Sequence, residues 1–267
     1  MIALKGVTCG YGKKIILDAI DLTVARGEFF GIIGPNGSGK TTILRCITRL
    51  TRIMNGMVLL DGTDMKNITV GNSAKIIAVV SQNMPTLPMT VEEFVLLGRI
   101  PYYGRLQFSE RPSDISITEK VMDMTGIAHL RKSLISQMSA GEVQLAFIAR
   151  ALAQEPRLLL LDEPTSHLDI THQVRILDLI KKLNRQEGLT VVIVLHDLNL
   201  ASEYCDRLAL VNEGKIARCG TPNEVLTYNT IEDVYKTVVV VRQNPLSRKP
   251  FVLIVSQEVK DTCEERS

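Results

Sequence analysis

A glycine-rich segment near the N-terminus carries the strongest chemical signal in the sequence. The stretch GPNGSGKTT satisfies the pattern G-x-x-x-x-G-K-[ST] and stands between a strand-like apolar run and a helical one. Such a loop turns backbone N–H groups and a helix N-terminus toward phosphate oxygens, while Lys40 can reach the β- and γ-phosphates and Thr41 can ligate Mg²⁺. The pattern therefore predicts nucleotide binding. The candidate residues are Gly34, Pro35, Asn36, Gly37, Ser38, Gly39, Lys40, Thr41 and Thr42.

Two adjacent carboxylates end another apolar run, LLLLDEP. Alternation along a strand points Asp162 and Glu163 in different directions, so that the two side chains can take different roles. Asp162 can hold Mg²⁺, and Glu163 can polarise an attacking water. Acidic residues also end strands without any such role. The phosphate loop in the same chain favours the chemical interpretation.

Gln82 and His196 also follow strand-like runs, KIIAVVSQ and TVVIVL. Alone, a glutamine there is an ordinary loop residue, and a histidine is more often a hydrogen-bonded structural residue than a catalytic one. Parallel strands, however, present their carboxyl ends at one edge of a sheet, where open α/β sheets bind ligands. We therefore expect four strand ends, at Gly34, Gln82, Asp162 and His196, to converge on one phosphate.

The stretch MSAGEVQ, Met138 to Gln144, directly precedes a helical apolar run. Ser139 followed three residues later by Glu142 is typical of a helix start, where a hydroxyl accepts a backbone N–H and a carboxylate meets the positive end of the dipole. The same exposed N–H groups can bind a phosphate that a second molecule supplies. On its own the stretch requires only the capping role.

The arrangement of apolar runs predicts an α/β fold. Short β-like runs open the chain, strand-like runs recur from Phe29 onward, and several of these are continuously apolar, as strands covered on both faces should be. Helical patterns dominate between Gln82 and Glu155. We expect one domain over 1–267. Its parts would be a core with an antiparallel β part (1–82 and 156–222), an inserted helical subdomain (83–155) and a C-terminal helix and β extension (223–267).

Composition excludes several classes of protein. The 267 residues are 45% apolar, which is enough for a sizeable core, and 31 basic against 29 acidic residues leave a formal charge of +2. This balance offers no concentrated basic surface, so we expect no nucleic-acid partner. Five cysteines without C-x-x-C spacing fit a reducing cytosol. With no leader-like segment and no membrane-spanning apolar run, we expect a cytosolic protein that can dock on a membrane protein.

Taken together, these residues give the sequence a resemblance, over essentially its whole length, to the ATP-binding subunits of ABC transporters. Tyr11 matches the aromatic residue that stacks on adenine, Gly34 to Thr42 the Walker A loop, and Gln82 the glutamine that senses magnesium and the attacking water. The remaining matches, in chain order, are the signature MSAGEVQ, the Walker B motif LLLLDEP, the D-loop from Ser166 to Asp169 and the switch histidine His196.

The resemblance implies a P-loop NTPase with a RecA-like core, an antiparallel β part and a helical subdomain, working with a second copy of itself. Each ATP would be closed between the Walker A loop of one subunit and the signature turn of the other. Ser139 and Gly141 would then donate to the γ-phosphate held by the partner's Lys40, and Asp169 would also face the nucleotide. Glu163 would act as the general base, and His196 would hold the γ-phosphate.

Narrower features resemble the importers of iron chelates, haem and cobalamin, namely VLLGRIPYYGRLQF, PTSHLDITHQ and VRQNPLSRKPFVL. This likeness implies an integral membrane permease docked in a groove from Gln82 to Arg105, an extracytoplasmic solute-binding protein, and a place on the cytoplasmic face of the cell membrane. Importers of molybdate, tungstate or another metal ion share many of these sequence features. Two further alternatives are a non-transport ATPase, such as a DNA-repair or ribosome-associated clamp, and a regulatory module without catalysis.

The signature departs from the commonest form of the family at Met138 and Ala140, and Gln144 is followed by Leu145 rather than a basic residue. The departure at Ala140 has two possible consequences. If the turn requires a positive φ there, alanine costs on the order of 1 kcal/mol and weakens the ATP-bound pair. If φ is negative, the methyl group is tolerated.

Overall fold

The computed structural model describes residues 1–12, 14–82, 87–104 and 109–256. Part of the expected permease groove, including Arg105, lies outside these residues. The chain divides into two compact units. The first consists of Met1, Ala25–Gly27 and Leu60–Ile193, and the second of Ile2–Val24, Glu28–Leu59 and Val194–Ser267.

Strands β6 (Ile77–Val80), β7 (Leu158–Asp162) and β8 (Thr190–Val194) of the first unit confirm predicted apolar runs, and β8 ends in the second unit. The first unit also contains the short β5 (Thr63–Asp64), neither of whose residues is buried. β7 lies between β6 and β8, and it runs parallel to β6 with Val80 opposite Leu161. All residues of β7 and β8 are buried, as continuously apolar strands require.

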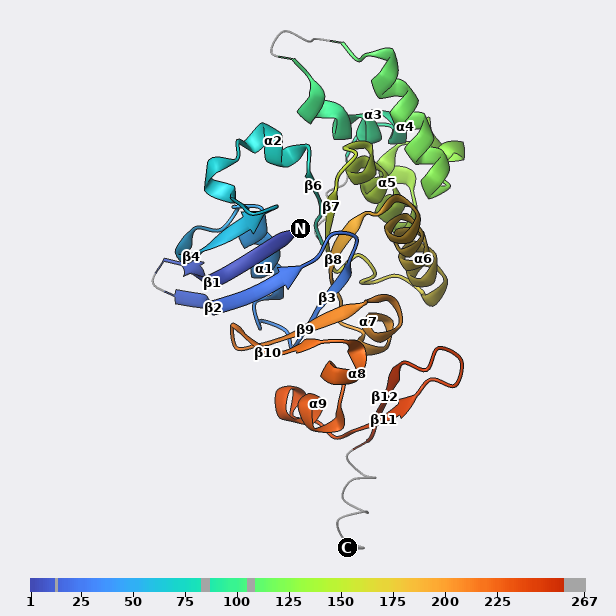
Figure 1. The fold of residues 1–267 in the computed structure, drawn as a ribbon. Helices are drawn as coiled ribbons and strands as arrows, with labels where there is room; N and C mark the ends of the chain where they lie inside the picture. The colour runs from blue at the N-terminus through green and yellow to red at the C-terminus, as the bar shows by residue number, and fades with distance from the viewer. Residues whose placement is uncertain (13, 83–86, 105–108, 257–267) are drawn as a thin grey trace, which may run out of the picture. The chain divides into compact units, whose positions relative to one another are not determined.

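The helices of the first unit include those predicted between Gln82 and Glu155. Helices α3, α4 and α5 pack against one another in pairs (Figure 1). Helix α4 begins at Pro112, because proline is well suited to a first helical turn. The helices are α2 (Val70–Ala74), α3 (Val91–Leu96), α4 (Pro112–Thr125), α5 (Ala140–Ala153) and α6 (Ile170–Glu187), with 3₁₀ turns η1 (Met65–Asn67), η2 (Leu97–Tyr102), η3 (Ala128–Leu130) and η4 (Ile135–Gln137).

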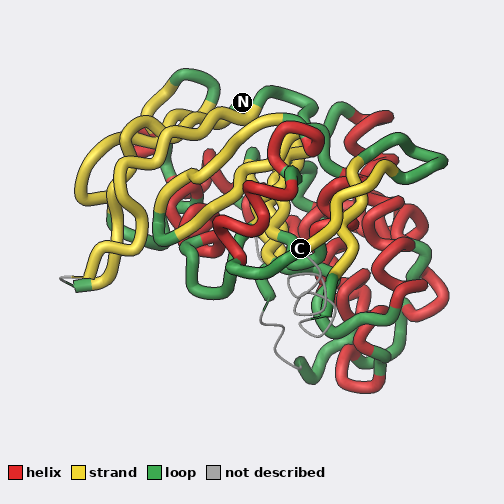
Figure 2. Tube along the Cα trace, turned by 90° about the horizontal axis from the view of Figure 1, so that it is seen from below, coloured by secondary structure: helices red, strands yellow, loops and turns green. Residues whose placement is uncertain are grey.

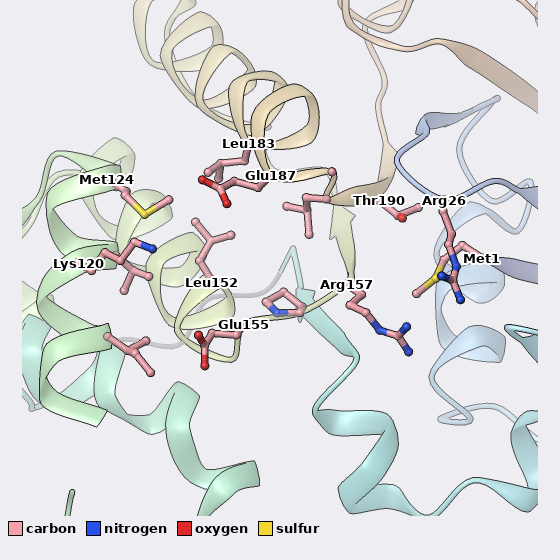
Figure 3. Close-up of a pocket in the computed structure, with 15 residues that line it drawn as sticks. Met1, Arg26, Lys120, Met124, Leu152, Glu155, Arg157, Leu183, Glu187 and Thr190 are labelled. Carbon is pink, nitrogen blue, oxygen red and sulfur yellow. The ribbon is translucent and has the colours of Figure 1, made fainter. Parts of the chain in front are cut away.

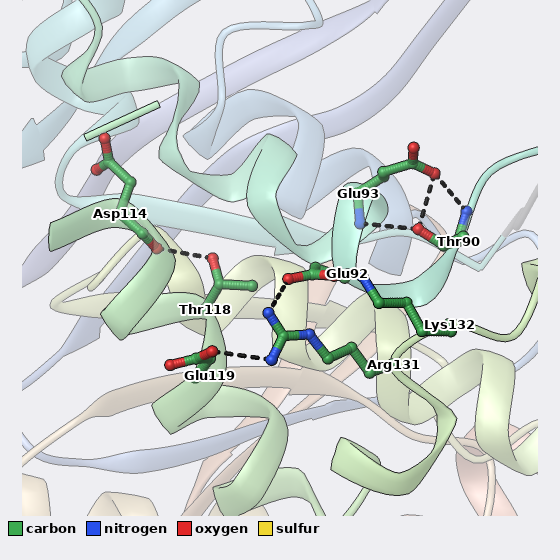
Figure 4. A network of polar contacts seen from close by, with 8 residues as sticks. All are labelled: Thr90, Glu92, Glu93, Asp114, Thr118, Glu119, Arg131 and Lys132. Carbon is green, nitrogen blue, oxygen red and sulfur yellow. Dashed lines mark hydrogen bonds and ion pairs between the residues drawn. The ribbon is translucent and has the colours of Figure 1, made fainter. Parts of the chain in front are cut away.

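A polar network links the start of α3 to the segment that follows η3 (Figure 4). The Arg131 guanidinium donates to Glu92 and, over 2.8 Å, to Glu119, while the Lys132 ammonium donates to Glu92 over 2.8 Å. The two cations, Arg131 first, lower the pKa of Glu92 to about 2. The Glu92 carboxylate is therefore expected to hold these segments together only while it is ionised.

Substituting Glu92→Gln is expected to lower the free energy of unfolding by about 1 kcal/mol at neutral pH, a typical value for a charge-assisted hydrogen bond. A depressed pKa contributes stability above the unfolded value of 4.5, and this contribution is lost as the pH falls from 4.5 toward 2. Denaturant titrations at pH 7 and at pH 3.5 should show the difference from the wild-type protein shrinking. Glu119→Gln, at a carboxylate 48% exposed beside the same Arg131, is the matched control with a smaller effect. A difference that does not change with pH would contradict the prediction.

The strands of the second unit begin with the predicted antiparallel pair. β1 and β2 run side by side near the N-terminus (Figure 2), β3 pairs in parallel with β9, and a hairpin pairs β9 with β10. A second hairpin pairs β11 with β12. The strands are β1 (Ile2–Tyr11), β2 (Lys14–Val24), β3 (Phe29–Ile33), β4 (Ile53–Leu60), β9 (Arg207–Asn212), β10 (Lys215–Gly220), β11 (Val239–Gln243) and β12 (Pro250–Ile254).

The helices of the second unit are α1 (Lys40–Ile47), α7 (Leu198–Tyr204), α8 (Pro222–Val225) and α9 (Tyr228–Tyr235). The helical pattern after Pro222 therefore forms two helices rather than one. The break comes at Leu226, whose backbone is not helical, and Thr227 then caps α9 by accepting the backbone N–H of Thr230. In the described parts of the chain, no helix combines the length and the apolar character that crossing a membrane would require.

Candidate nucleotide site

The predicted phosphate loop lies in the second unit, between β3 and α1. β3 is buried throughout, and the loop leaves it with φ angles of 147° at Gly34, 76° at Gly37 and 109° at Gly39. A Cβ atom at Gly34 would lie 2.1 Å from the carbonyl oxygen of Val211. Glycine is thus required at Gly34 by the close packing against Val211 as well as by φ.

Ser38, Lys40 and Thr42 are the buried polar residues of this loop. The Lys40 ammonium donates to the carbonyl oxygens of Gly34 and Pro35, each over 2.9 Å. The Ser38 hydroxyl has no hydrogen-bond partner among the residues that the structure describes, although Ser38 is only 4% exposed. A buried hydroxyl left unpaired costs about 1–3 kcal/mol. A phosphate oxygen in the loop would satisfy it, so these residues fit the predicted ligand.

Tyr11 lies at the end of β1 and is half exposed. Its hydroxyl accepts a hydrogen bond from Arg45 of α1 over 3.0 Å and lies 3.4 Å from the Thr51 hydroxyl; these bonds, Thr51 first, lower the pKa of Tyr11. The ring borders a cavity of about 520 Å³ whose other lining residues lie at 10–12 and 50–54. Tyr11 is therefore tied to the helix that follows the loop, while the cavity beside it contains no loop residue.

The predicted carboxylate pair lies in the first unit, at the end of β7. Asp162 is the last residue of the strand and is buried, whereas Glu163 adopts a left-handed φ of 53° that is costly for a residue with a side chain. The Glu163 carboxylate accepts a hydrogen bond from the Gln82 amide over 2.7 Å and another from the Ser166 hydroxyl over 3.2 Å. The structure thus brings Gln82 and Glu163 together, and it adds Ser166, which sequence reasoning did not single out as a site residue.

The signature turn caps α5. The Ser139 hydroxyl donates to the Glu142 carboxylate over 2.7 Å and accepts the Glu142 backbone N–H over 3.4 Å, and these bonds with Ser139 lower the pKa of Glu142. Ala140 is the first residue of the helix, and its φ is not positive. Of the two alternatives for Ala140, the structure therefore favours the one in which the methyl group is tolerated.

The D-loop ends at Asp169, which caps α6. One Asp169 carboxylate oxygen accepts the backbone N–H of His172 over 2.9 Å, and the other lies 2.9 Å from Nδ1 of the His172 ring; these bonds lower the pKa of Asp169. The His172 ring also packs against Gly141. Sequence reasoning missed His172. Its spacing of three residues from the helix cap was the available signal.

His196 lies in the second unit and is exposed. The residue before it, Leu195, donates its backbone N–H to Ile32 of β3 over 3.1 Å, so His196 follows a strand end adjacent to the one that leads into the phosphate loop. The four predicted strand ends thus form two pairs. Gly34 and His196 follow neighbouring strand ends in the second unit, and Gln82 meets Glu163 in the first. Convergence of all four stays a prediction.

A cavity of about 520 Å³ lies in the first unit, between the C-terminal parts of α4, α5 and α6 (Figure 3). Its lining mixes apolar side chains with charged ones, including Lys120, Leu152, Leu183 and Glu187. None of the sequence-predicted site residues lines it. The candidate site is therefore built from loops and helix starts rather than from this cavity.

Comparison with known proteins places these features in one family. The family model described as ABC transporter matches residues 17–166, more than half of the chain. The uncharacterised ABC transporter ATP-binding protein YvrA of Bacillus subtilis is 40% identical over 98% of the chain, which spans 59% of the length of YvrA. The ferric enterobactin transport ATP-binding protein FepC of Escherichia coli is 38% identical over 96% of the chain and 95% of FepC.

Solved structures agree with this assignment. The dimeric ABC transporter cassette MJ0796 superposes with a TM-score of 0.74 and 32% identity, over 83% of this chain and 98% of that one. A metal-chelate type ABC transporter in an inward-facing conformation shares the fold, with a TM-score of 0.85 and 23% identity over 97% of this chain and 98% of that one. With its phosphate loop, its paired Gln82 and Glu163 and its capped signature turn, the chain belongs to the ABC transporter family, among the ATP-binding cassettes.

Proposed function

We propose that the chain is the ATP-hydrolysing subunit of an importer that moves an iron chelate through a separate membrane permease. The observation that carries this proposal is the 38% identity to FepC, a ferric enterobactin transport protein, over 95% of the length of FepC. The alternatives within transport are haem, cobalamin, molybdate, tungstate or another metal ion as the solute.

ATP would bind with its phosphates in the loop from Gly34 to Thr42. Backbone N–H groups and the start of α1 attract the anion, and the unpaired Ser38 hydroxyl supports a ligand at this point. Lys40 would exchange its two loop carbonyl partners for the β- and γ-phosphates. Tyr11, with its exposed ring held by Arg45, would stack on the adenine.

Mg²⁺ would accompany the nucleotide and neutralise the charge that develops on the phosphate oxygens. Thr41, Gln82 and Asp162 would hold it, because they offer the hydroxyl, amide and carboxylate oxygens that this hard cation prefers. The buried position of Asp162 suits a carboxylate that meets a cation rather than solvent.

Glu163 would act as the general base that takes a proton from the water attacking the γ-phosphate. Its hydrogen bonds with Gln82 and Ser166 hold the carboxylate at the strand end and support this role. His196 would bind the γ-phosphate and keep the reacting groups in place.

Two copies of the chain would close on ATP, as the dimeric form of MJ0796 suggests. Ser139, Gly141 and Asp169 would face the nucleotide held by the partner's Lys40. The Ser139 hydroxyl, which donates to the Glu142 carboxylate in this structure, would donate to the γ-phosphate instead. The Glu142 carboxylate would keep the hydrogen bond that it accepts from the Ser139 backbone N–H over 2.9 Å. Hydrolysis removes the anion that both faces bind, so the pair would open after each cycle.

The membrane partner would be a permease that docks in the groove from Gln82 to Arg105, on the cytoplasmic face of the membrane. In this arrangement residues 83–155 form a helical subdomain that moves relative to the core. A solute-binding protein on the other side of the membrane would deliver the chelate.

Copurification tests the proposal. The chain should copurify with a polytopic permease encoded beside it, and ATP hydrolysis by the complex in liposomes should rise when the solute-binding protein is added with a ferric siderophore. Molybdate or cobalamin as the stimulating solute would correct the solute class. Stimulation by DNA or ribosomes, without any permease partner, would instead support the clamp alternative.

A further inference from the structure

His172 lies between the signature turn and the D-loop of the first unit. In the proposed function, both segments face the partner subunit. His172 is the third residue of α6, three residues after the cap Asp169, and its side chain is 34% exposed. On one side the ring bonds to the D-loop carboxylate. On the other side it lies against Gly141 of the signature turn.

The contact with Gly141 leaves no room for a side chain. A Cβ atom added at Gly141 would lie 2.2 Å from Cδ2 of the His172 ring and 2.8 Å from both Cγ and Nε2. The ring cannot swing away freely, because Nδ1 is tied to Asp169 over 2.9 Å and the backbone N–H of His172 is tied to the same carboxylate. The φ angle of Gly141 is not positive, so this contact, rather than the backbone conformation, demands glycine within the subunit.

We propose that His172 is a positioning residue that fixes the signature turn, Ser139 to Glu142, against the D-loop, Ser166 to Asp169, of the same subunit. The proposal rests on the proposed function, in which both turns meet the nucleotide site of the partner. Held together by the imidazole, the two turns approach that site as one surface. Without the His172 ring, the signature turn and the D-loop have to be ordered separately, which slows the closure of the two subunits after ATP binding.

Of the two small residues at the start of α5, only the second needs to be small. Ala140 already carries a methyl group, as the first residue of α5 and exposed to solvent. Gly141, one residue later, is buried under the ring. The glycine at 141 is thus matched to a histidine at 172, and shortening His172 should make a methyl group at 141 acceptable.

A double-mutant cycle tests this match. ATP hydrolysis is measured for the wild-type chain, Gly141→Ala, His172→Ala and the double variant, with Thr171→Ala as the control at the neighbouring exposed position of α6. We expect His172→Ala to lower kcat about fivefold with an unchanged KM for ATP, because Lys40 and the loop bind ATP first. The kcat of Gly141→Ala should be at least thirtyfold below that of the wild-type chain. The kcat of the double variant should be at least threefold above that of Gly141→Ala, and no higher than that of His172→Ala.

A double variant no more active than Gly141→Ala would overturn the proposal, since the glycine would then be needed by the partner's phosphate and not by His172. A kcat of His172→Ala equal to that of Thr171→Ala would overturn it as well. Thermal unfolding midpoints test the contact between His172 and Gly141 independently of the proposed function, because they do not depend on ATP hydrolysis. If the wild-type chain fails to hydrolyse ATP, the proposed function is wrong, while recovery of the Gly141→Ala midpoint by His172→Ala still reports the contact. Should Gly141→Ala fail to fold, folding of the double variant supports the match, and failure of both contradicts it.

Discussion

Glu163→Gln is expected to bind ATP with nearly wild-type affinity and to hydrolyse it about a thousandfold more slowly, within the usual range for removal of a general base. The carboxylate accepts hydrogen bonds from Gln82 and Ser166, so it has two fixed partners and a defined orientation at the end of β7. A glutamine of the same shape can keep a contact there, but it cannot take the proton of the attacking water. Phosphate release under saturating ATP and Mg²⁺ measures the effect.

Glu213→Gln is the matched control for this variant. Glu213 also has a left-handed backbone, with φ at 46°, and is itself exposed in the turn between β9 and β10. The same chemical change at the same backbone conformation should leave turnover unchanged. Normal turnover by Glu163→Gln would refute the assignment of the general base.

Lys40→Ala is expected to weaken nucleotide binding about a hundredfold, equivalent to about 2.7 kcal/mol. The ammonium is buried against the loop, where it donates to the carbonyl oxygens of Gly34 and Pro35, beside the proposed phosphate site. A charge-assisted contact in so sheltered a position is stronger than one at the surface. Titration with a fluorescent ATP analogue measures the change in affinity.

Lys215→Ala serves as the control for Lys40→Ala. Lys215 lies in the same unit, is exposed and pairs with Asp18 over 3.3 Å. Its removal changes the net charge equally but touches no loop residue, so affinity should be unchanged. If Lys40→Ala also left affinity unchanged, the phosphate loop would have to be reconsidered.

Continuous apolar runs made the buried strands predictable, because β3, β7 and β8 are buried along their whole length and consist almost entirely of apolar residues. Helix α6 was not singled out from the sequence. Its buried residues, Ile176, Leu177, Ile180, Leu183 and Asn184, stand at helical spacing, so the pattern of a helix with one buried face was present in the sequence.

The candidate site was predictable where its residues follow strand ends, because parallel pairing alone brings Gln82 to Glu163. The contacts of His172 were not predictable from the sequence, because they join helix starts about 30 residues apart and depend on how α5 packs near α6. The sequence also left open whether Ala140 strains the signature turn. The φ angle at the start of α5 answers that question, and only a structure supplies it.

Closure of two subunits on ATP is the central claim, and sedimentation of Glu163→Gln tests it most directly. With ATP and Mg²⁺ this variant should sediment as a dimer, because the γ-phosphate would remain between the Walker A loop of one copy and the signature turn of the other. With ADP it should sediment as a monomer. A variant that stays monomeric with saturating ATP, or that dimerises equally with ADP, would contradict the account.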